Sequence, residues 1–246
     1  SISRTRASPT TSGSTVAEVR RGLRTALSRA SLPTTPRARL TGAERMFDTV
    51  AMLPKHLLEA AYQAGVNRYF FASSACVYNT DLQQDPDVRA LKESDAFPAM
   101  AERGYGWEKL FAEMLCQEYW AERHMKTFIA RFHNVYGPNG TWDGGREKAP
   151  AAICRKVVQA KDSGMNEIMI WGDGTQTRSF TYIEDCVLGI DKIVHCDELV
   201  ATPINLGSSE LISINDLVSL AEEIGDIKLT RKYDLSAPRG VARRNS

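Results

Sequence analysis

The sequence has no long apolar run and no marked excess of positive or negative charge. None of its hydrophobic stretches approaches the ~18 consecutive apolar residues that a membrane-spanning helix needs, so we expect no membrane as a partner. Lysine and arginine together number 31 and aspartate and glutamate 30, which leaves a net charge of +1. A charge this small gives no reason to expect a nucleic acid as a partner.

Paired cysteines and paired metal ligands are also missing. The five cysteines are widely spaced and form no C-x-x-C pair, and His124 and His133 have no further ligand at metal-binding spacing. We therefore expect no disulfide framework and no bound metal, and a protein of the reducing cytoplasm. The cysteines are Cys76, Cys116, Cys154, Cys186 and Cys196.

Acidic residues are scarce in the first 47 residues, where only Glu18 and Glu44 carry a negative charge. This segment is rich in Ser, Thr, Arg and Pro. Such a composition cannot bury enough apolar surface to fold, and we predict that residues 1–47 are mostly disordered. Two origins fit the segment: an organelle transit peptide, or a partial or wrongly assigned reading frame. The start at Ser1 favours the second origin.

A regular pattern begins near Met52. Apolar residues recur at helical spacing over 54–64 and 105–123, and each helix is followed by a short apolar run, at 68–74 and 127–132, that suits a buried parallel strand. Helix and strand alternate with crossover-length connections, which predicts an α/β fold with a parallel sheet. Farther along we expect helices at 149–160, 183–195 and 213–224, strands at 168–171 and 227–233, and a short element at 203–206.

The first candidate for chemistry is the pair Tyr105 and Lys109. Residues four apart share one helical face, so the ammonium can approach the phenol. A free phenol has a pKa near 10, and service as a base near neutrality needs a shift of roughly 3 units, about 4 kcal/mol. The neighbouring lysine and a cationic nicotinamide could supply that shift by charge proximity. Alone, the Y-x-x-x-K spacing is common among surface pairs of helices.

The surroundings of this pair make it more specific. Ser73–Tyr78 follows a predicted strand, and ligands of open α/β sheets bind outside the carboxyl ends of strands. A serine hydroxyl there can donate to a substrate oxygen whose proton the tyrosine removes. The next strand ends at His133–Pro138 (HNVYGP). A strand end with serines, then Y-x-x-x-K, then a second strand end is the order found in short-chain dehydrogenase/reductases.

Longer motifs narrow the resemblance. Over residues 48–246 the chain resembles the GDP-mannose 3,5-epimerases, a family of extended short-chain dehydrogenase/reductases. The resemblance implies a partial Rossmann-like parallel sheet. It assigns 48–136 to the C-terminal half of an NAD-binding domain and 137–246 mainly to a smaller α/β nucleotide-sugar-binding region, incomplete at its C-terminus. The motifs are SSAC (73–76), LKESDA (91–96), RFHNVYGPNGTWDGGREKAPAAICRK (131–156) and WGDGTQTRSF (171–180).

The resemblance also implies a reaction. Enzymes of this family oxidise carbon 4 of the mannosyl ring with bound NAD, invert carbons 3 and 5 by proton exchange, and return the hydride. Tyr105 and Lys109 match the residues for hydride chemistry, together with Ser74, and Cys76 and Lys148 match the acid/base pair. A thiol with a pKa near 8.5, or an ammonium whose pKa burial has lowered, can exchange protons near pH 7.

Binding residues carry over from the same motifs. Arginine forks suit a diphosphate, because they give bidentate charge-assisted hydrogen bonds. Family members commonly pair as homodimers through the two long helices, here 54–64 and 105–123. The cofactor residues implied are Ser74, Ala75, Cys76, Tyr105 and Lys109. The GDP-sugar residues implied are Ser74, Ala75, Cys76, Asn134, Glu147, Lys148, Ala149, Lys156, Gln176, Thr177, Arg178 and Arg244.

The chain departs from the family pattern at both ends. It has no G-x-x-G-x-x-G turn after a strand, and the acidic residue that meets the adenosine ribose is missing. The family also continues past the position of Ser246. We therefore expect weak or no NAD binding and unpaired edges of the sheet. Two alternatives stay open: another sugar-nucleotide epimerase or dehydratase of the same family, and a non-catalytic remnant that binds a nucleotide sugar or a partner subunit.

Overall fold

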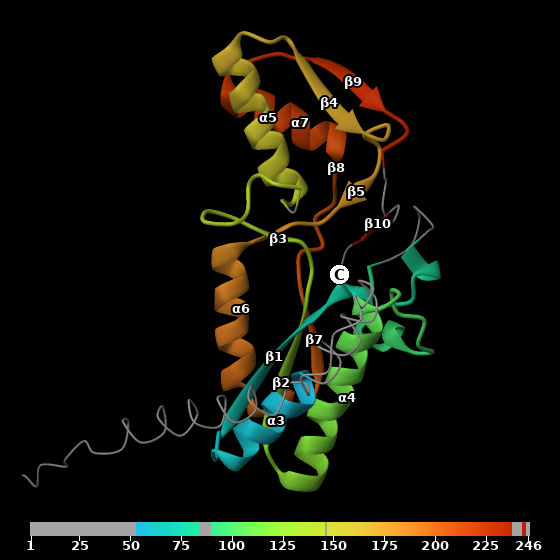
Figure 1. Cartoon of the computed structure of the whole chain (residues 1–246), viewed down its shortest axis with the longest axis vertical. Coiled ribbons are helices and arrows are strands. Elements are labelled where there is room, and N and C mark those ends of the chain that lie inside the picture. Colours follow the sequence, from blue (N-terminus) through green and yellow to red (C-terminus); the bar gives the residue numbers. More distant parts are fainter. Residues whose placement is uncertain (1–52, 84–89, 146, 238–242, 245–246) are drawn as a thin grey trace, which may run out of the picture.

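The computed structural model describes residues 53–83, 90–145, 147–237 and 243–244. The predicted disorder of 1–47 falls outside these residues. Two α/β units lie one above the other along the long axis (Figure 1). The predicted α/β class with parallel strands is confirmed, since each unit contains a parallel pair or sheet covered by helices.

The lower unit in Figure 1 is a three-stranded parallel sheet. Its order is β1-β2-β7, formed by β1 (Arg68–Ser74), β2 (Lys126–Phe132) and β7 (Pro203–Leu206). Helices α3 (Leu53–Gln63) and α4 (Tyr105–Arg123) cover one face, and α6 (Ile183–His195) covers the other.

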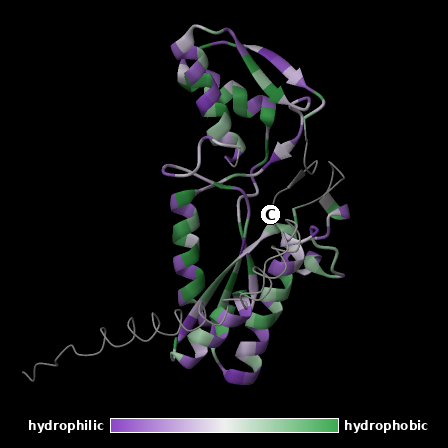
Figure 2. Cartoon of the chain, viewed as in Figure 1, coloured by the Kyte–Doolittle hydropathy of each residue, from purple (hydrophilic) through white to green (hydrophobic). Residues whose placement is uncertain are grey.

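The two faces of β2 explain this layering. Ile129 packs with Leu58 and Cys116 from the helices of one face, whereas Phe128 and Ala130 pack with α6 on the other face. Side chains of a strand alternate between faces, so a strand that is apolar at successive positions is buried on both sides. Figure 2 shows green and purple residues alternating around the helices, as expected where one helical face meets the core.

The upper unit packs two helices against a parallel strand pair. Helices α5 (Ala149–Ser163) and α7 (Ile214–Gly225) enclose a core with β4 (Glu167–Trp171) and β9 (Thr230–Asp234). The strand predicted at 227–233 begins only at Thr230. Helix α7 ends in a left-handed residue, and the N–H of Ile227 then bonds the carbonyl of Glu222, 3.1 Å away, so Ile227 completes the helix end.

Short strands join the two units, and the sequence did not predict them as strands because two residues show no periodicity. Strand β3 (Val135–Tyr136) pairs with β6 (Thr181–Tyr182). Strand β5 (Thr177–Arg178) lies between β8 (Ile212–Ser213) and β10 (Arg243–Arg244). The 3-10 turns are η1 (Ala75–Val77), η2 (Asp81–Gln83), η3 (Glu93–Ala96) and η4 (Asp197–Leu199).

The chain passes between the units more than once. The elements α6 and β7 come after the first upper-unit elements in sequence, yet they pack on the lower sheet. The assignment of residues 48–136 to NAD binding and of residues 137–246 mainly to nucleotide-sugar binding stays a prediction. Within the described residues, β1 pairs with β2 alone. No helix in this part of the chain combines the length and apolar character needed to cross a bilayer.

Candidate active site

A buried ion pair fixes the carboxyl end of the lower sheet. The guanidinium of Arg131 on β2 lies 2.7 Å from the carboxylate of Glu113 on α4, and both side chains are only 2% exposed. Ser73 at the end of β1 donates its hydroxyl hydrogen to Glu113. Arg131 also donates to the hydroxyl of Tyr78 at 3.1 Å. These contacts therefore fix the position of α4 relative to the ends of β1 and β2.

The segment that carries Cys76 lies directly on the first turn of α4. The backbone amide of Glu102 donates to the carbonyl of Cys76 at 2.9 Å, and the hydroxyl of Ser74 accepts from the amide of Cys76 at 3.2 Å. A Cβ atom at position 106 would collide with the Cys76 carbonyl oxygen. Glycine is therefore needed there, and the turn that begins with Tyr105 abuts the residue that carries the thiol.

Tyr105 and Lys109 share a face of α4, as predicted. The ammonium of Lys109 lies 5.3 Å from the ring centre of Tyr105 and 5.0 Å from that of Phe71. The expected lowering of the Tyr105 pKa is not found. Partial burial and the nearby Cys76 thiol raise this pKa, against the opposite effect of a hydrogen bond with Ser74. The lysine meets the aromatic face of the phenol, and in this chain the phenol is a weaker acid than a free one.

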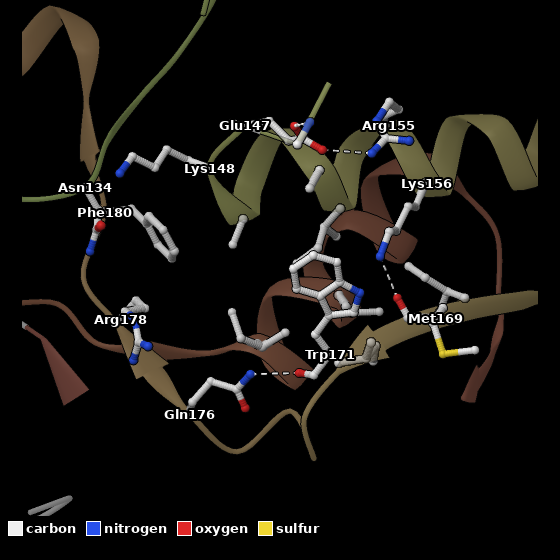
Figure 3. Close-up of a pocket in the computed structure, with 18 residues that line it drawn as sticks. Asn134, Glu147, Lys148, Arg155, Lys156, Met169, Trp171, Gln176, Arg178 and Phe180 are labelled. Carbon is white, nitrogen blue, oxygen red and sulfur yellow. Dashed lines mark hydrogen bonds and ion pairs between the residues drawn. The ribbon is translucent and has the colours of Figure 1, made fainter. Parts of the chain in front are cut away.

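A cavity of about 350 Å³ opens in the upper unit, among α5, β4, β5 and α7. Figure 3 shows Lys148 and Arg178 on one side of it, Arg155 and Lys156 on the other, and the indole of Trp171 between them. Its lining includes seven of the residues that the resemblance assigned to the GDP-sugar. These are Asn134, Glu147, Lys148, Ala149, Lys156, Gln176 and Arg178.

Backbone contacts hold several of these side chains. The ammonium of Lys156 donates to the carbonyl of Met169 at 2.7 Å, and the amide of Gln176 donates to the carbonyl of Trp171 at 2.9 Å. Asn134 donates to the carbonyl of Ser179 at 3.1 Å. Partial burial and the nearby Arg155 lower the pKa of Lys156. An anion entering the cavity would raise the pKa of Lys156 again, because it would balance the charges of the two cations.

The carboxylate of Glu147 is already satisfied within the chain. Its pKa is held below the usual value by a hydrogen bond from its own backbone amide, and further by Arg155 and by the amide of Gly145. The guanidinium of Arg155 is 3.0 Å from this carboxylate. An ionised Glu147 beside Arg155 adds a fixed ion pair to a cavity that is lined by cationic and amide side chains as well as by aliphatic and aromatic ones.

The other predicted site residues lie outside this cavity. Ser74, Ala75, Cys76, Tyr105 and Lys109 lie at the end of β1 and the start of α4. The convergence of the Cys76 thiol and the Lys148 ammonium on one sugar ring stays a prediction, since Cys76 does not line the cavity. Thr177 does not line it either, and the side chain of Arg244 falls outside the described residues, although its backbone pairs with Arg178.

Sequence reasoning missed several lining residues. Arg155, Met169, Trp171 and Phe180 also line the cavity. The alternating burial of β4, in which Ile168 and Ile170 are buried while Met169 and Trp171 are exposed, follows from period two and could have marked Trp171. Nothing in the local pattern marks Arg155.

Among the described residues no group of three His, Cys, Asp or Glu side chains is placed to hold a metal ion.

Comparisons with known proteins show the family of the chain. The family model described as the NAD dependent epimerase/dehydratase family matches residues 12–207. The chain belongs to this family. The match begins farther toward the N-terminus than the resemblance over 48–246. The chain is 45% identical over 195 residues to "GDP-mannose 3,5-epimerase 1" of Oryza sativa subsp. indica, covering 79% of this chain and 50% of that protein. The chain thus spans about half the length of the curated relatives it matches.

Solved structures of the family show the same fold. UDP-glucuronic acid 4-epimerase from Bacillus cereus, in complex with UDP-glucuronic acid and NAD, matches with a TM-score of 0.66 at 27% identity, over 81% of this chain and 59% of that one. A GDP-L-fucose synthetase from Naegleria fowleri matches with a TM-score of 0.73 at 16% identity, over 93% and 73% of the two chains. The likeness to the second shows the fold alone.

This member of the epimerase/dehydratase family fits the reacting end of a dinucleotide. Tyr105 is 43% exposed at the carboxyl end of the sheet, so a ligand can reach its ring, and Lys109 packs against the same ring. The groups for the other end of the cofactor do not occur in the sequence, whose 17 glycines form no G-x-x-G-x-x-G run.

Proposed function

We propose that the chain acts on GDP-D-mannose and belongs to an epimerase that forms GDP-L-galactose by inversion at carbons 3 and 5. The observation that carries the proposal is the cavity, whose lining includes seven side chains that the sequence motifs assigned to a GDP-sugar. The 45% identity to a GDP-mannose 3,5-epimerase supports the same substrate.

The chemistry of the cavity suits a nucleoside diphosphate sugar. Arg178 and Lys156 supply positive charge for a diphosphate, and the exposed indole of Trp171 offers a flat apolar surface to a base. Lys148, directly before α5, lies at the rim where a sugar would extend from the diphosphate. The two ends of the ligand would thus meet different kinds of side chain.

The reaction needs a proton donor and acceptor at carbons 3 and 5. A ketone at carbon 4 acidifies both neighbouring C–H bonds, and NAD, when bound, supplies the reversible oxidation that forms it. Cys76 and Lys148 would exchange the protons. Tyr105 would hold the proton of the carbon 4 hydroxyl, with Ser74 hydrogen-bonded beside it. Lys109 would orient the phenol through its contact with the ring face.

A homodimer is part of the proposal. Trp107, Phe111 and Met114 lie on one side of α4, at spacings of four and three, and are 46%, 50% and 48% exposed. An apolar stripe this continuous on a helix surface favours contact with a second subunit. The neighbouring helix α3 would form the rest of such a contact.

Isothermal titration of the chain with GDP-mannose and with UDP-glucose tests the substrate. We expect GDP-mannose to bind more tightly, and Arg178→Met to weaken its binding about tenfold or more, since a charged hydrogen bond is worth about 1.5–3 kcal/mol. Arg123→Met, at the opposite end of the lower sheet, is the control and should leave the affinity unchanged. Equal or tighter binding of UDP-glucose would favour another sugar-nucleotide enzyme of the family, and binding of neither would contradict the proposal.

Solvent exchange tests the inversion chemistry. In heavy water, with NAD added at millimolar concentration because we expect this chain to bind NAD only weakly, we expect deuterium to enter the sugar of GDP-mannose. We expect Cys76→Ala to stop this exchange without loss of GDP-mannose binding. Mass spectrometry of the recovered sugar measures both. Binding without exchange by the unchanged chain would favour the non-catalytic nucleotide-sugar-binding alternative, and exchange by the Cys76→Ala variant would remove the thiol from the mechanism.

A further inference from the structure

The segment before α5 carries Lys148 and depends on contacts made outside itself. Gly144 and Gly145 have φ angles of +91° and +82°, and a side chain at either position would meet no other atom within 4 Å. Lys148 is the N-cap residue of α5 but makes no capping hydrogen bond through its side chain. The position of its ammonium is therefore set by whatever holds the residues just before it.

One guanidinium, that of Arg155, makes these contacts. Its Nε donates to the carbonyl of Trp142 at 3.0 Å and lies 3.6 Å from the carboxylate of Asp143. Its Nη2 donates to the carboxylate of Glu147 at 3.0 Å. Arg155, in the second turn of α5, thus forms hydrogen bonds or ion pairs with both ends of the segment, at 142–143 and at 147.

The contacts of Glu147 complete the arrangement. Its second carboxylate oxygen accepts from the amide of Gly145 at 2.7 Å, which ties the glycine turn to the same ion pair. Arg155 and Glu147 are 20% and 9% exposed, so water screens the pair only partly. A lysine at 155 could meet Glu147, but it has no planar fork with which to bond Trp142 as well.

We propose that Arg155 is a positioning residue: it clamps residues 142–145 and Glu147 onto α5 and so places Lys148 beside the cavity. The clamp itself is independent of the ligand, whereas its use for sugar chemistry rests on the proposed function. Arg155 acts through Glu147, the immediate neighbour of Lys148, and loss of the clamp would free Lys148 while the apolar walls of the cavity, formed by α5, β4 and α7, remained.

Limited proteolysis with a protease that cuts after glutamate tests the clamp. In the unchanged chain Glu147 is paired and mostly buried, whereas Glu167 has a side chain that is 60% exposed. We expect Arg155→Met to speed cutting between Glu147 and Lys148 at least fivefold, with no change after Glu167. Arg155→Lys should lie between the two and also covers the case in which Arg155→Met fails to fold. Equal cutting at residue 147 in all three proteins would overturn the clamp.

Arg231→Met is the matched control. Arg231 also pairs with a buried glutamate of the upper unit, Glu222, at 3.2 Å, and its side-chain hydrogen bonds among the described residues go to Ser219 and Glu222. Its loss should change the stability of the unit without changing the ratio of cutting at 147 to cutting at 167. A rise in that ratio equal to the rise in Arg155→Met would show a general loosening of the unit and would overturn a specific role of Arg155.

Labelling of lysines with acetic anhydride tests the use of the clamp. We expect GDP-mannose to protect Lys148 from labelling in the unchanged chain, and this protection to be at least fivefold weaker in Arg155→Met. A matching loss of GDP affinity with unchanged proteolysis would make Arg155 a direct ligand and overturn its positioning role. Absence of protection in the unchanged chain would contradict the proposed place of Lys148 beside the sugar, and the proteolysis result would still decide the clamp.

Discussion

At the scale of single residues, the contact between Gly106 and Cys76 sets the spacing of the proposed thiol and phenol. A side chain at position 106 would press on the Cys76 carbonyl, which also accepts a hydrogen bond from Glu102. We expect Gly106→Ala to lower the free energy of unfolding by about 1–3 kcal/mol, as overpacked sites do. Urea denaturation measures it, with Gly140→Ala, in a more open place, as the control. Equal stability of the two variants would contradict the close packing.

The pair Arg131 and Glu113 is a second residue-scale feature with a measurable consequence. Glu113→Ala would leave the guanidinium buried without its carboxylate, and removal of one partner of a buried pair costs about 3–5 kcal/mol. Thermal or urea unfolding should show a loss of this size. Glu122→Ala, at an exposed position of the same helix, should change the stability by less than about 0.5 kcal/mol. A small loss in Glu113→Ala would show that water reaches Arg131.

At the scale of elements, Glu222 joins α7 to the turn and strand that follow. Burial alone would raise its pKa, but hydrogen bonds from Lys228, from the amide of Leu229 and from Arg231 outweigh burial and hold the pKa below its ordinary value of 4.5. A carboxyl whose pKa is lowered by folding stabilises the fold above the unfolded-state pKa, and this contribution is lost as the pH falls through the folded-state value.

This gives a prediction of pH dependence. At pH 7 we expect Glu222→Gln to be less stable than the unchanged chain, and the difference to shrink progressively as the pH falls below about 4.5. Urea denaturation at a series of pH values measures it. Glu223→Gln, at the exposed neighbouring position, should show no such pH dependence. A difference that stays constant from pH 7 to pH 3 would show that the charge of Glu222 is not involved.

Prediction from the sequence worked best for elements with a long, regular pattern. The bounds of α4, α6 and β1 were predicted to the residue, because their apolar residues follow a regular pattern over the whole element. The late start of β9 depends on how α7 ends, which is a matter of backbone hydrogen bonds. The two-residue strands and the clamp by Arg155 arise from tertiary contacts, and no local pattern encodes them.

The sequence motifs predicted part of the lining of the cavity but not which predicted site residues would lie outside it. Motifs identified Lys156 and Arg178 as ligand-binding candidates, and the structure brings both to one cavity. They could not show that Cys76 is absent from the lining of that cavity, because the lining depends on how the elements pack. The lowering of the Tyr105 pKa by Lys109 together with a cationic nicotinamide stays a prediction. In the chain alone burial raises this pKa, and spacing along a helix does not reveal burial.

At the scale of the whole molecule, we expect the chain to have a low affinity for NAD. NAD pyrophosphate usually rests on a helix N-terminus behind a glycine-rich turn, and the 246 residues contain no G-x-x-G-x-x-G run. We expect titration calorimetry to show no NAD binding in the micromolar range. GDP-mannose, titrated into the same preparation, is the control for folded protein. A micromolar dissociation constant for NAD would show that another part of the chain holds the pyrophosphate.

The crossings between the two units have a mechanical consequence. The chain passes from one unit to the other through β3, through β5 and β6, and through β8, and these strands hydrogen-bond to one another in pairs. A rotation of the upper unit over the lower sheet would have to twist three covalent connections at once and shear the bonds between them. The hydrogen bonds of both strand pairs therefore oppose such a rotation, and they couple any movement of one connection to its paired neighbour.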